Sequence, residues 1–117
     1  MSRTTPRTAA PPGQVWACRL SEVPLEGAIA VRVAGEPVAV VRTSAGVFAL
    51  HDACSHAEVP LSQGEVAGCT IECWLHGSRF DLRTGRPVGA PATRPVTTYP
   101  VVADGDDVFI CLRPTEH

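Results

Sequence analysis

The sequence predicts a small all-β protein built from short antiparallel strands. At 117 residues, the chain has the usual size of one domain. Stretches rich in β-branched residues are separated by turn residues about every 8–12 positions, and no window keeps the 3.6-residue period of an amphipathic helix. Apolar residues make up 44% of the chain and charged residues 19%, which allows a modest core and argues against global disorder.

The strand-like stretches follow one another from residue 14 onward. The first alternates residue by residue, and Pro24 and Gly27 separate it from the second. Turn residues at 35–37, at 44–46, at Gly68 and at 104–106 join neighbouring stretches, which favours hairpins. We expect strands at residues 14–20, 28–33, 38–42, 47–51, 65–67, 70–73, 97–103 and 107–112.

The remaining segments are expected to be irregular. Residues 1–13 contain three prolines and no hydrophobic period, so we predict a disordered N-terminal tail. The domain then covers residues 14–112, and residues 113–117 form a short C-terminal tail. Prolines between residues 86 and 95 exclude a helix or a central strand there.

The composition excludes several classes of function. A net charge of −2 argues against nucleic acid as a partner. No apolar run approaches the roughly 18–20 residues that cross a bilayer, and the N-terminus has no apolar signal core. The five cysteines include no Cys-x-x-Cys pair, so a reducing cytoplasm is the expected location.

One pattern in the middle of the chain points to a metal centre. Cys54-Ser55-His56 is followed, after sixteen residues, by Cys73-Trp74-Leu75-His76. Two loops, at 52–64 and 73–85, would each offer one thiol and one imidazole. Thiolate and neutral imidazole bind both zinc and iron, and two of each complete a first coordination shell. The donor set alone therefore allows a zinc-stabilised binding module as well as a binuclear iron centre.

The Cys-x-His and Cys-x-x-His pattern resembles the Rieske family, in which histidines replace two cysteines on one iron of a 2Fe–2S cluster. The resemblance implies that Cys54 and Cys73 bind one iron, and that His56 and His76 bind the other. It implies a small Rieske-type antiparallel β sandwich or barrel, with a cluster-binding subdomain formed by the two loops. Ser78 and the segment 61–64 also resemble that family, which favours one 2Fe–2S cluster over zinc.

The donor types also indicate the redox behaviour. Two ferric ions, two sulfides and two thiolates sum to zero, so the oxidised centre with neutral imidazoles accepts an electron more readily than an all-Cys centre. In the respiratory members of the family, a Ser and a Tyr hydroxyl donate hydrogen bonds to the sulfurs. Ser78 matches the first position, whereas Phe80 cannot donate at the second. We therefore expect a potential of about −150 to 0 mV.

Within the family, the chain resembles the small ferredoxins of bacterial oxygenase systems. Leu75 stands where the respiratory members have a disulfide-forming Cys, and the length leaves no room for a mononuclear iron site. The resemblance implies a monomeric one-electron carrier, not an enzyme, that passes electrons from a flavin-dependent reductase to a terminal, ring-hydroxylating oxygenase. The alternative hypothesis for a redox protein is that the chain is a small subunit of an assimilatory nitrite reductase.

Other residues receive structural interpretations. Cys18, Cys69 and Cys111 are expected to be buried thiols, and His51 is expected to be structural or solvated and not a ligand. Trp74 lies between ligands and would either shield the cluster or pack against the protein. From the resemblance, residues 86–95 would run over the cluster as a rigid cover, with 89–91 closest to it. Partners are expected to dock at the end that bears His56 and His76, next to Arg79.

Overall fold

The computed structural model describes residues 14–53, 59–74, 77–88 and 94–112. Within these residues, it contains strands and two short 3₁₀ helices, η2 (Leu20–Glu22) and η3 (Leu61–Gln63). The predicted tails at 1–13 and 113–117 lie outside the described residues. The strands are β1 (Gln14–Arg19), β2 (Gly27–Val33), β3 (Glu36–Thr43), β4 (Gly46–His51), β5 (Glu65–Ala67), β6 (Thr70–Glu72), β7 (Arg79–Asp81), β8 (Thr98–Tyr99), β9 (Val101–Asp104) and β10 (Asp107–Cys111).

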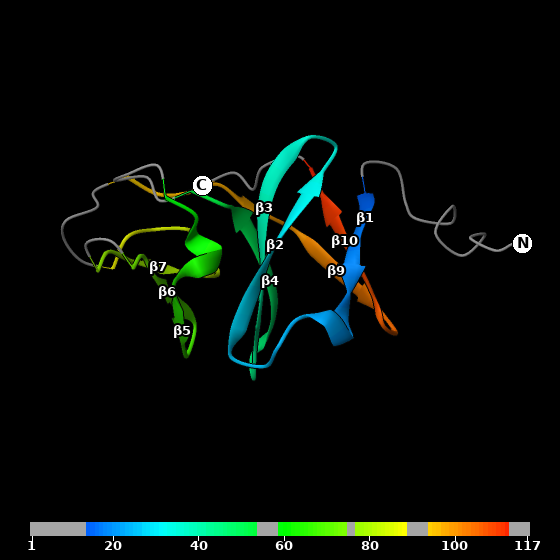
Figure 1. The fold of residues 1–117 in the computed structure, drawn as a ribbon, viewed down its shortest axis with the longest axis horizontal. Helices are drawn as coiled ribbons and strands as arrows, with labels where there is room; N and C mark the ends of the chain where they lie inside the picture. Colours follow the sequence, from blue (N-terminus) through cyan, green and yellow to red (C-terminus); the bar gives the residue numbers. More distant parts are fainter. Residues whose placement is uncertain (1–13, 54–58, 75–76, 89–93, 113–117) are drawn as a thin grey trace, which may run out of the picture.

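The strands form three antiparallel sheets, which confirms the all-β prediction (Figure 1). The central sheet has the order β2-β3-β4-β8. A sheet of order β1-β10-β9 lies on one side of it, and a small sheet of order β5-β6-β7 lies on the other. η3 lies within the first predicted loop and β7 within the second, while β5 and β6 lie between the two loops. β7 is a strand that the sequence pattern did not predict.

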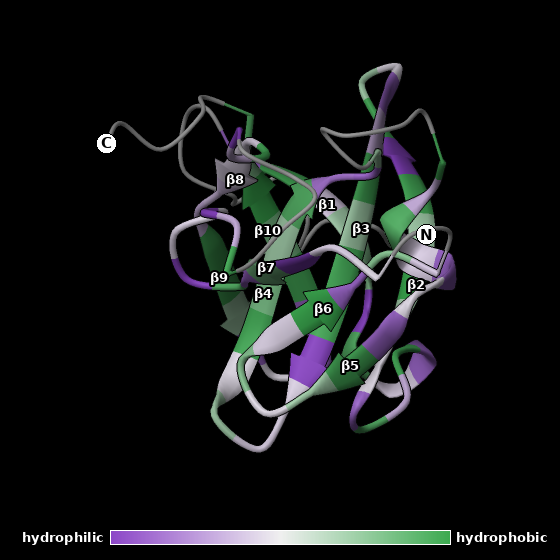
Figure 2. Ribbon diagram, turned by 90° about the vertical axis from the view of Figure 1, so that its left-hand side faces the viewer, coloured by the Kyte–Doolittle hydropathy of each residue, from purple (hydrophilic) through white to green (hydrophobic). Residues whose placement is uncertain are grey.

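The central sheet is buried on both faces because β3 carries apolar residues at consecutive positions. Val38 and Val40 pack into a core shared with β1 and β10, while Ala39 and Val41 pack into a core shared with β6 and β7. Strands buried on both faces read as continuous apolar runs and do not alternate. Figure 2 shows hydrophobic residues concentrated in the strands at the centre of the molecule.

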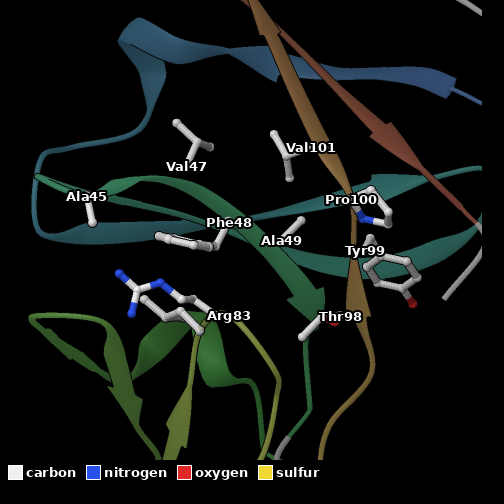
Figure 3. A pocket seen from close by; sticks show the side chains of 10 residues that line it. Ala45, Val47, Phe48, Ala49, Arg83, Thr98, Tyr99, Pro100 and Val101 are labelled. Atoms are coloured by element: carbon white, nitrogen blue, oxygen red, sulfur yellow. The ribbon is translucent and has the colours of Figure 1, made fainter. Parts of the chain in front are cut away.

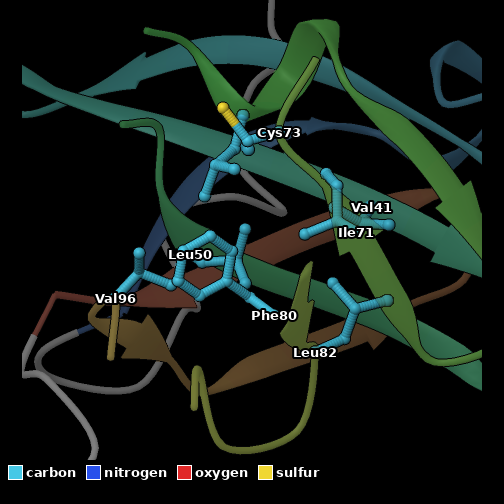
Figure 4. Close-up of a cluster of buried hydrophobic side chains, with 9 residues drawn as sticks. Val41, Leu50, Ile71, Cys73, Phe80, Leu82 and Val96 are labelled. Atoms are coloured by element: carbon cyan, nitrogen blue, oxygen red, sulfur yellow. The ribbon is translucent and has the colours of Figure 1, made fainter. Parts of the chain in front are cut away.

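The second of these cores joins the small sheet to the central sheet. Its members come from the central sheet, from η3 and from the strands around the second predicted loop. Phe80 and Leu50 are completely buried in it, and Cys73 is part of the same cluster (Figure 4). The full set of buried residues is Ala39, Val41, Leu50, Leu61, Ile71, Cys73, Phe80, Leu82 and Val96.

Two predictions about proline-containing segments were wrong. The turn expected at 35–37 is displaced, because Pro37 belongs to β3 and pairs with Arg32 of β2. Pro37 lies next to the start of its strand, where proline is tolerated. The strand expected at 97–103 is split at Pro100: β8 pairs with β4 in the central sheet, whereas β9 pairs with β10 in the next sheet.

Candidate metal centre

The second predicted loop starts directly after β6, at Cys73. Cys73 is buried, with 1% of its surface exposed, and its backbone N–H donates to the carbonyl of Ser78 at 2.7 Å. The Gly77 N–H donates to the carbonyl of Cys73 at 3.0 Å, and Gly77 has a φ of +77°. These bonds close a tight loop that runs from Cys73 back to the buried Ser78. Two antiparallel strands, β6 and β7, therefore fix both ends of the loop.

A close backbone approach connects this loop with the C-terminal end of the first predicted loop. Gly64 ends η3, and a Cβ atom placed on it would lie 1.9 Å from the carbonyl oxygen of Glu72. Real Cβ atoms do not come this near to an oxygen, so only glycine fits at this position. Because Glu72 precedes Cys73, the end of η3 contacts the strand that delivers a proposed ligand.

The base of the first predicted loop is held by a pair of short hydrogen bonds. The Ser62 N–H donates to Oδ1 of Asp52 and the Ser62 hydroxyl donates to Oδ2, both at 2.7 Å. Asp52 is largely buried, with 9% of its surface exposed. Neither Asp52 nor Ser62 was predicted from the sequence to support the site. The only hint in the sequence is a carboxylate just before the Cys-x-His motif and a hydroxyl residue after it.

The four proposed ligands are only partly within the described residues. Cys54, His56 and His76 lie outside them, as do residues 89–91, the part of the predicted cover expected closest to the cluster. Cys73 lies inside them, at the end of β6. The donor types still fit a 2Fe–2S centre with mixed ligands, and a buried thiol in an apolar cluster is a suitable position for a cluster ligand.

The surface beside Cys73 carries exposed apolar side chains. Trp74 is 54% exposed and Val88 is 58% exposed, so Trp74 does not pack into the core. Close to these residues in the chain and in the sheet, Arg79 Nε lies 3.2 Å from Glu72 Oε1, and the Val88 N–H donates to the carbonyl of Arg79 at 2.8 Å. Trp74 and Glu72 also line a hollow of about 410 Å³ with Gln63, Gly64 and Glu65.

The remaining cysteines are only partly as predicted. Cys18 is buried and free, and burial, followed by the charges of Glu22 and Asp106, raises its pKa to about 11. Cys69 and Cys111 are free but only half-buried. Cys69 lies in the turn between β5 and β6, and Cys111 lies at the last position of β10, so neither reaches the interior fully.

Two further hollows lie away from Cys73. His51 is half-buried and lines one of them with Glu36 and Tyr99, and burial together with Glu36 raises the pKa of Tyr99. The other, about 460 Å³, lies between β4 and the β8–β9 segment, with Phe48 and Arg83 at its wall (Figure 3). Among the described residues that line these two hollows, Cys73 is absent.

Comparison with known proteins identifies the class. The family model described as the Rieske [2Fe-2S] domain matches residues 13–100, which is most of the chain. The chain therefore belongs to the Rieske family and carries one Rieske-type 2Fe–2S cluster. Within the described residues, no helix is long and apolar enough to span a membrane.

Similar proteins narrow the class to ferredoxins. The ferredoxin subunit of 3-phenylpropionate/cinnamic acid dioxygenase from Escherichia coli K12 is 42% identical over 85% of this chain and 93% of its own length. The ferredoxin of carbazole 1,9a-dioxygenase from Nocardioides aromaticivorans IC177 is 38% identical, covers 84% of this chain and 96% of its own, and superimposes with a TM-score of 0.79.

A further solved structure is a complex of reduced oxygenase and oxidised ferredoxin in carbazole 1,9a-dioxygenase. It matches with 29% identity and a TM-score of 0.81, over 90% of this chain and 98% of the matched chain. The chain is thus a Rieske-type ferredoxin, an electron-transfer component of an oxygenase system and not the catalytic subunit. When bound, the cluster takes up and releases one electron.

Proposed function

We propose that this ferredoxin carries single electrons from a flavin-containing reductase to a terminal, ring-hydroxylating oxygenase. The observation that supports this most is the 42% identity to dioxygenase ferredoxin subunits over 93% of their length. A matched structure in which a ferredoxin is bound to an oxygenase supports the second half of the transfer. These two similar proteins, both ferredoxins of dioxygenases, favour the carrier role over that of a nitrite reductase subunit.

We further propose that Cys54 and Cys73 bind one iron of the cluster and that His56 and His76 bind the other. The order and spacing of the four residues support this assignment, and so does the burial of Cys73 between β6 and β7. The free thiols at Cys18, Cys69 and Cys111 suit a reducing cytoplasm. We expect a monomer in solution, which light scattering during size-exclusion chromatography would test.

The oxygenase is proposed to dock on the surface formed by Trp74, Val88, Glu72 and Arg79. Weak redox encounters use small interfaces, and aromatic side chains and arginine are enriched at their centres. Here the exposed Trp74 lines a hollow with Glu72, the exposed Val88 is bonded to the backbone of Arg79, and Glu72 directly precedes a proposed cluster ligand. An apolar patch with a charged pair suits brief docking with a short path for the electron.

Stopped-flow kinetics would test the carrier role and the docking surface together. The partners would be the purified reductase and oxygenase components of the E. coli dioxygenase whose ferredoxin is similar to this chain. Arg79→Glu should slow oxidation of the reduced ferredoxin by the oxygenase and change its dependence on salt. The matched control is Arg19→Glu, the same charge change at an exposed position of β1, on the other side of the central sheet (Figure 1).

Two results would count against these proposals. If the wild-type protein accepts no electrons from the reductase and passes none to the oxygenase, the carrier role in such a system is wrong. If transfer is intact but Arg19→Glu alters its salt dependence more than Arg79→Glu does, the docking surface lies elsewhere.

A further inference from the structure

The pair formed by Asp52 and Ser62 connects two parts of the chain that are proposed to hold the cluster. Asp52 directly follows β4 and precedes Cys54 by two residues. Ser62 lies in η3, near the C-terminal end of the first predicted loop. Both carboxylate oxygens of Asp52 accept a bond from Ser62, at 2.7 Å each. The pair therefore fixes the distance between the two ends of residues 53–61.

Asp52 is itself anchored to the central sheet. Its N–H donates to the carbonyl of Pro37 at 3.1 Å, and the preceding His51 N–H donates to the carbonyl of Thr97 at 2.8 Å. These bonds extend the pairing of β4 with its two neighbours by one residue on each side. The Asp52 carboxylate thus projects from a rigid position, largely shielded from water.

Ser62 is anchored to the small sheet. Its neighbour Leu61 is completely buried in the core that contains Cys73, and Gly64 closes η3 by donating to the carbonyl of Leu61 at 2.8 Å. Gly64 in turn lies against the backbone of Glu72, the residue before Cys73. A continuous series of contacts runs from Asp52 through Ser62 and Gly64 to the strand that delivers Cys73.

We propose that Asp52 and Ser62 are positioning residues for the cluster, which set the spacing between the strand end that leads to Cys54 and the strand end that delivers Cys73. The proposal rests on the assignment of these two cysteines as ligands. Neither Asp52 nor Ser62 binds iron. Their bonds hold together the two segments that lead to these cysteines, so weakening the bonds makes loss of the cluster faster.

The test is the rate at which the purified, cluster-loaded ferredoxin loses its visible absorbance in the presence of an iron chelator. Ser62→Ala removes the hydroxyl bond but keeps the Asp52 charge, so it separates positioning from electrostatics. Loss should be about tenfold faster in Ser62→Ala, as expected for one missing charge-assisted bond. Ser62→Thr, which keeps a hydroxyl, should restore the wild-type rate. The double variant Asp52→Ala/Ser62→Ala should lose the cluster no faster than Asp52→Ala alone, because the two residues act through one interaction.

A control separates positioning from general destabilisation. Thr43 is also buried, and its hydroxyl oxygen accepts a bond from the Ala45 N–H at 3.0 Å, in the turn between β3 and β4. Thr43→Val should lower the melting temperature but leave the rate of cluster loss unchanged. The electron paramagnetic resonance spectrum of the reduced protein should broaden or shift in Ser62→Ala, return in Ser62→Thr, and stay unchanged in Thr43→Val.

The proposal is overturned if Ser62→Ala loses its cluster at the wild-type rate, or no faster than a Thr43→Val protein with the same drop in melting temperature. Failure of the ligand assignment would look different. In that case Cys54→Ala would still assemble a cluster with the native spectrum, whereas Ser62→Ala is expected to assemble normally and differ only in retention and signal shape.

Discussion

Gly64→Ala tests how closely η3 approaches the strand that precedes Cys73. The backbone of Gly64 has φ −85° and ψ −177°, a conformation open to any residue, so strain in φ does not contribute. The added Cβ would lie 1.9 Å from the Glu72 carbonyl oxygen and 3.1 Å from that of Leu61. Real Cβ atoms essentially never come closer than 3.0 Å to such an atom, so the two backbones must separate by about 1.1 Å or more.

The expected cost follows from that displacement. Overpacking a tight contact typically costs about 1–3 kcal/mol, and for a domain of this size about 2 kcal/mol lowers the melting temperature by about 10 °C. Because the displaced strand ends at Cys73, the iron content should fall as well. Melting followed by circular dichroism, with iron measured on the same samples, would show both effects.

Gly105→Ala is the matched control, since a Cβ there meets nothing within 4 Å and the residue lies in the β9–β10 turn. Its φ of +62° should cost about 1 kcal/mol without loss of iron. The reasoning is refuted if Gly64→Ala melts at the wild-type temperature with full iron, or if Gly105→Ala loses more iron than Gly64→Ala does.

Three further predictions concern the sulfur-bearing and neighbouring residues. Cys73→Ala should abolish normal cluster assembly, whereas Cys69→Ser, at a half-buried position in the β5–β6 turn, should keep the wild-type iron content. Iron analysis with visible spectra decides between the two thiols. Voltammetry at one pH should show a lower potential for Ser78→Ala. Phe80→Tyr should raise the reduction potential by about 40 mV if a hydrogen bond from the new hydroxyl to a sulfur strengthens by roughly 1 kcal/mol on reduction. Unshifted potentials in both variants would show that neither position donates a hydrogen bond to a cluster sulfur. The pKa of Cys18 rises from 9.0 to about 11 in the folded protein. Above pH 9 the unfolded chain loses this proton while the folded protein keeps it, so the stabilisation by the protonated thiol is fully present only below pH 9. That stabilisation, up to about 3 kcal/mol, should be lost as the pH rises from 9 to 11. Melting temperatures across that range should fall more steeply for the wild type than for Cys18→Ala, and parallel slopes would contradict the shift.

The local strand order was largely predictable from the sequence. The pairs β3–β4 and β5–β6 are hairpins with short turns, so the strand pattern and turn residues suffice to predict them. The pairing of β1 with β10 was not predictable in this way. It joins the two ends of the domain, with Trp16 Nε1 donating to Asp107 across 91 positions, and nothing in either local pattern specifies the partner.

The candidate metal centre also has some features that the sequence predicts and others that it does not. The donor types and spacing of Cys54, His56, Cys73 and His76 are visible in the sequence, because the chemistry depends on residue identity. The bonds between Asp52 and Ser62 and the approach of Gly64 to Glu72 are not visible, because they exist only once η3 packs against two sheets. Such supporting contacts depend on tertiary structure, and sequence patterns do not report them.

The most direct test of the ligand assignment is a count of the histidine nitrogens bound to the cluster. The chain has four histidines, so Asn substitution of His51 and His117 together leaves only His56 and His76. Pulsed electron paramagnetic resonance of the reduced double variant should show two coupled histidine nitrogens and the wild-type spectrum, with two irons per chain. Loss of one nitrogen coupling, or of the cluster without unfolding, would contradict the assignment of His56 and His76 as the two imidazole ligands.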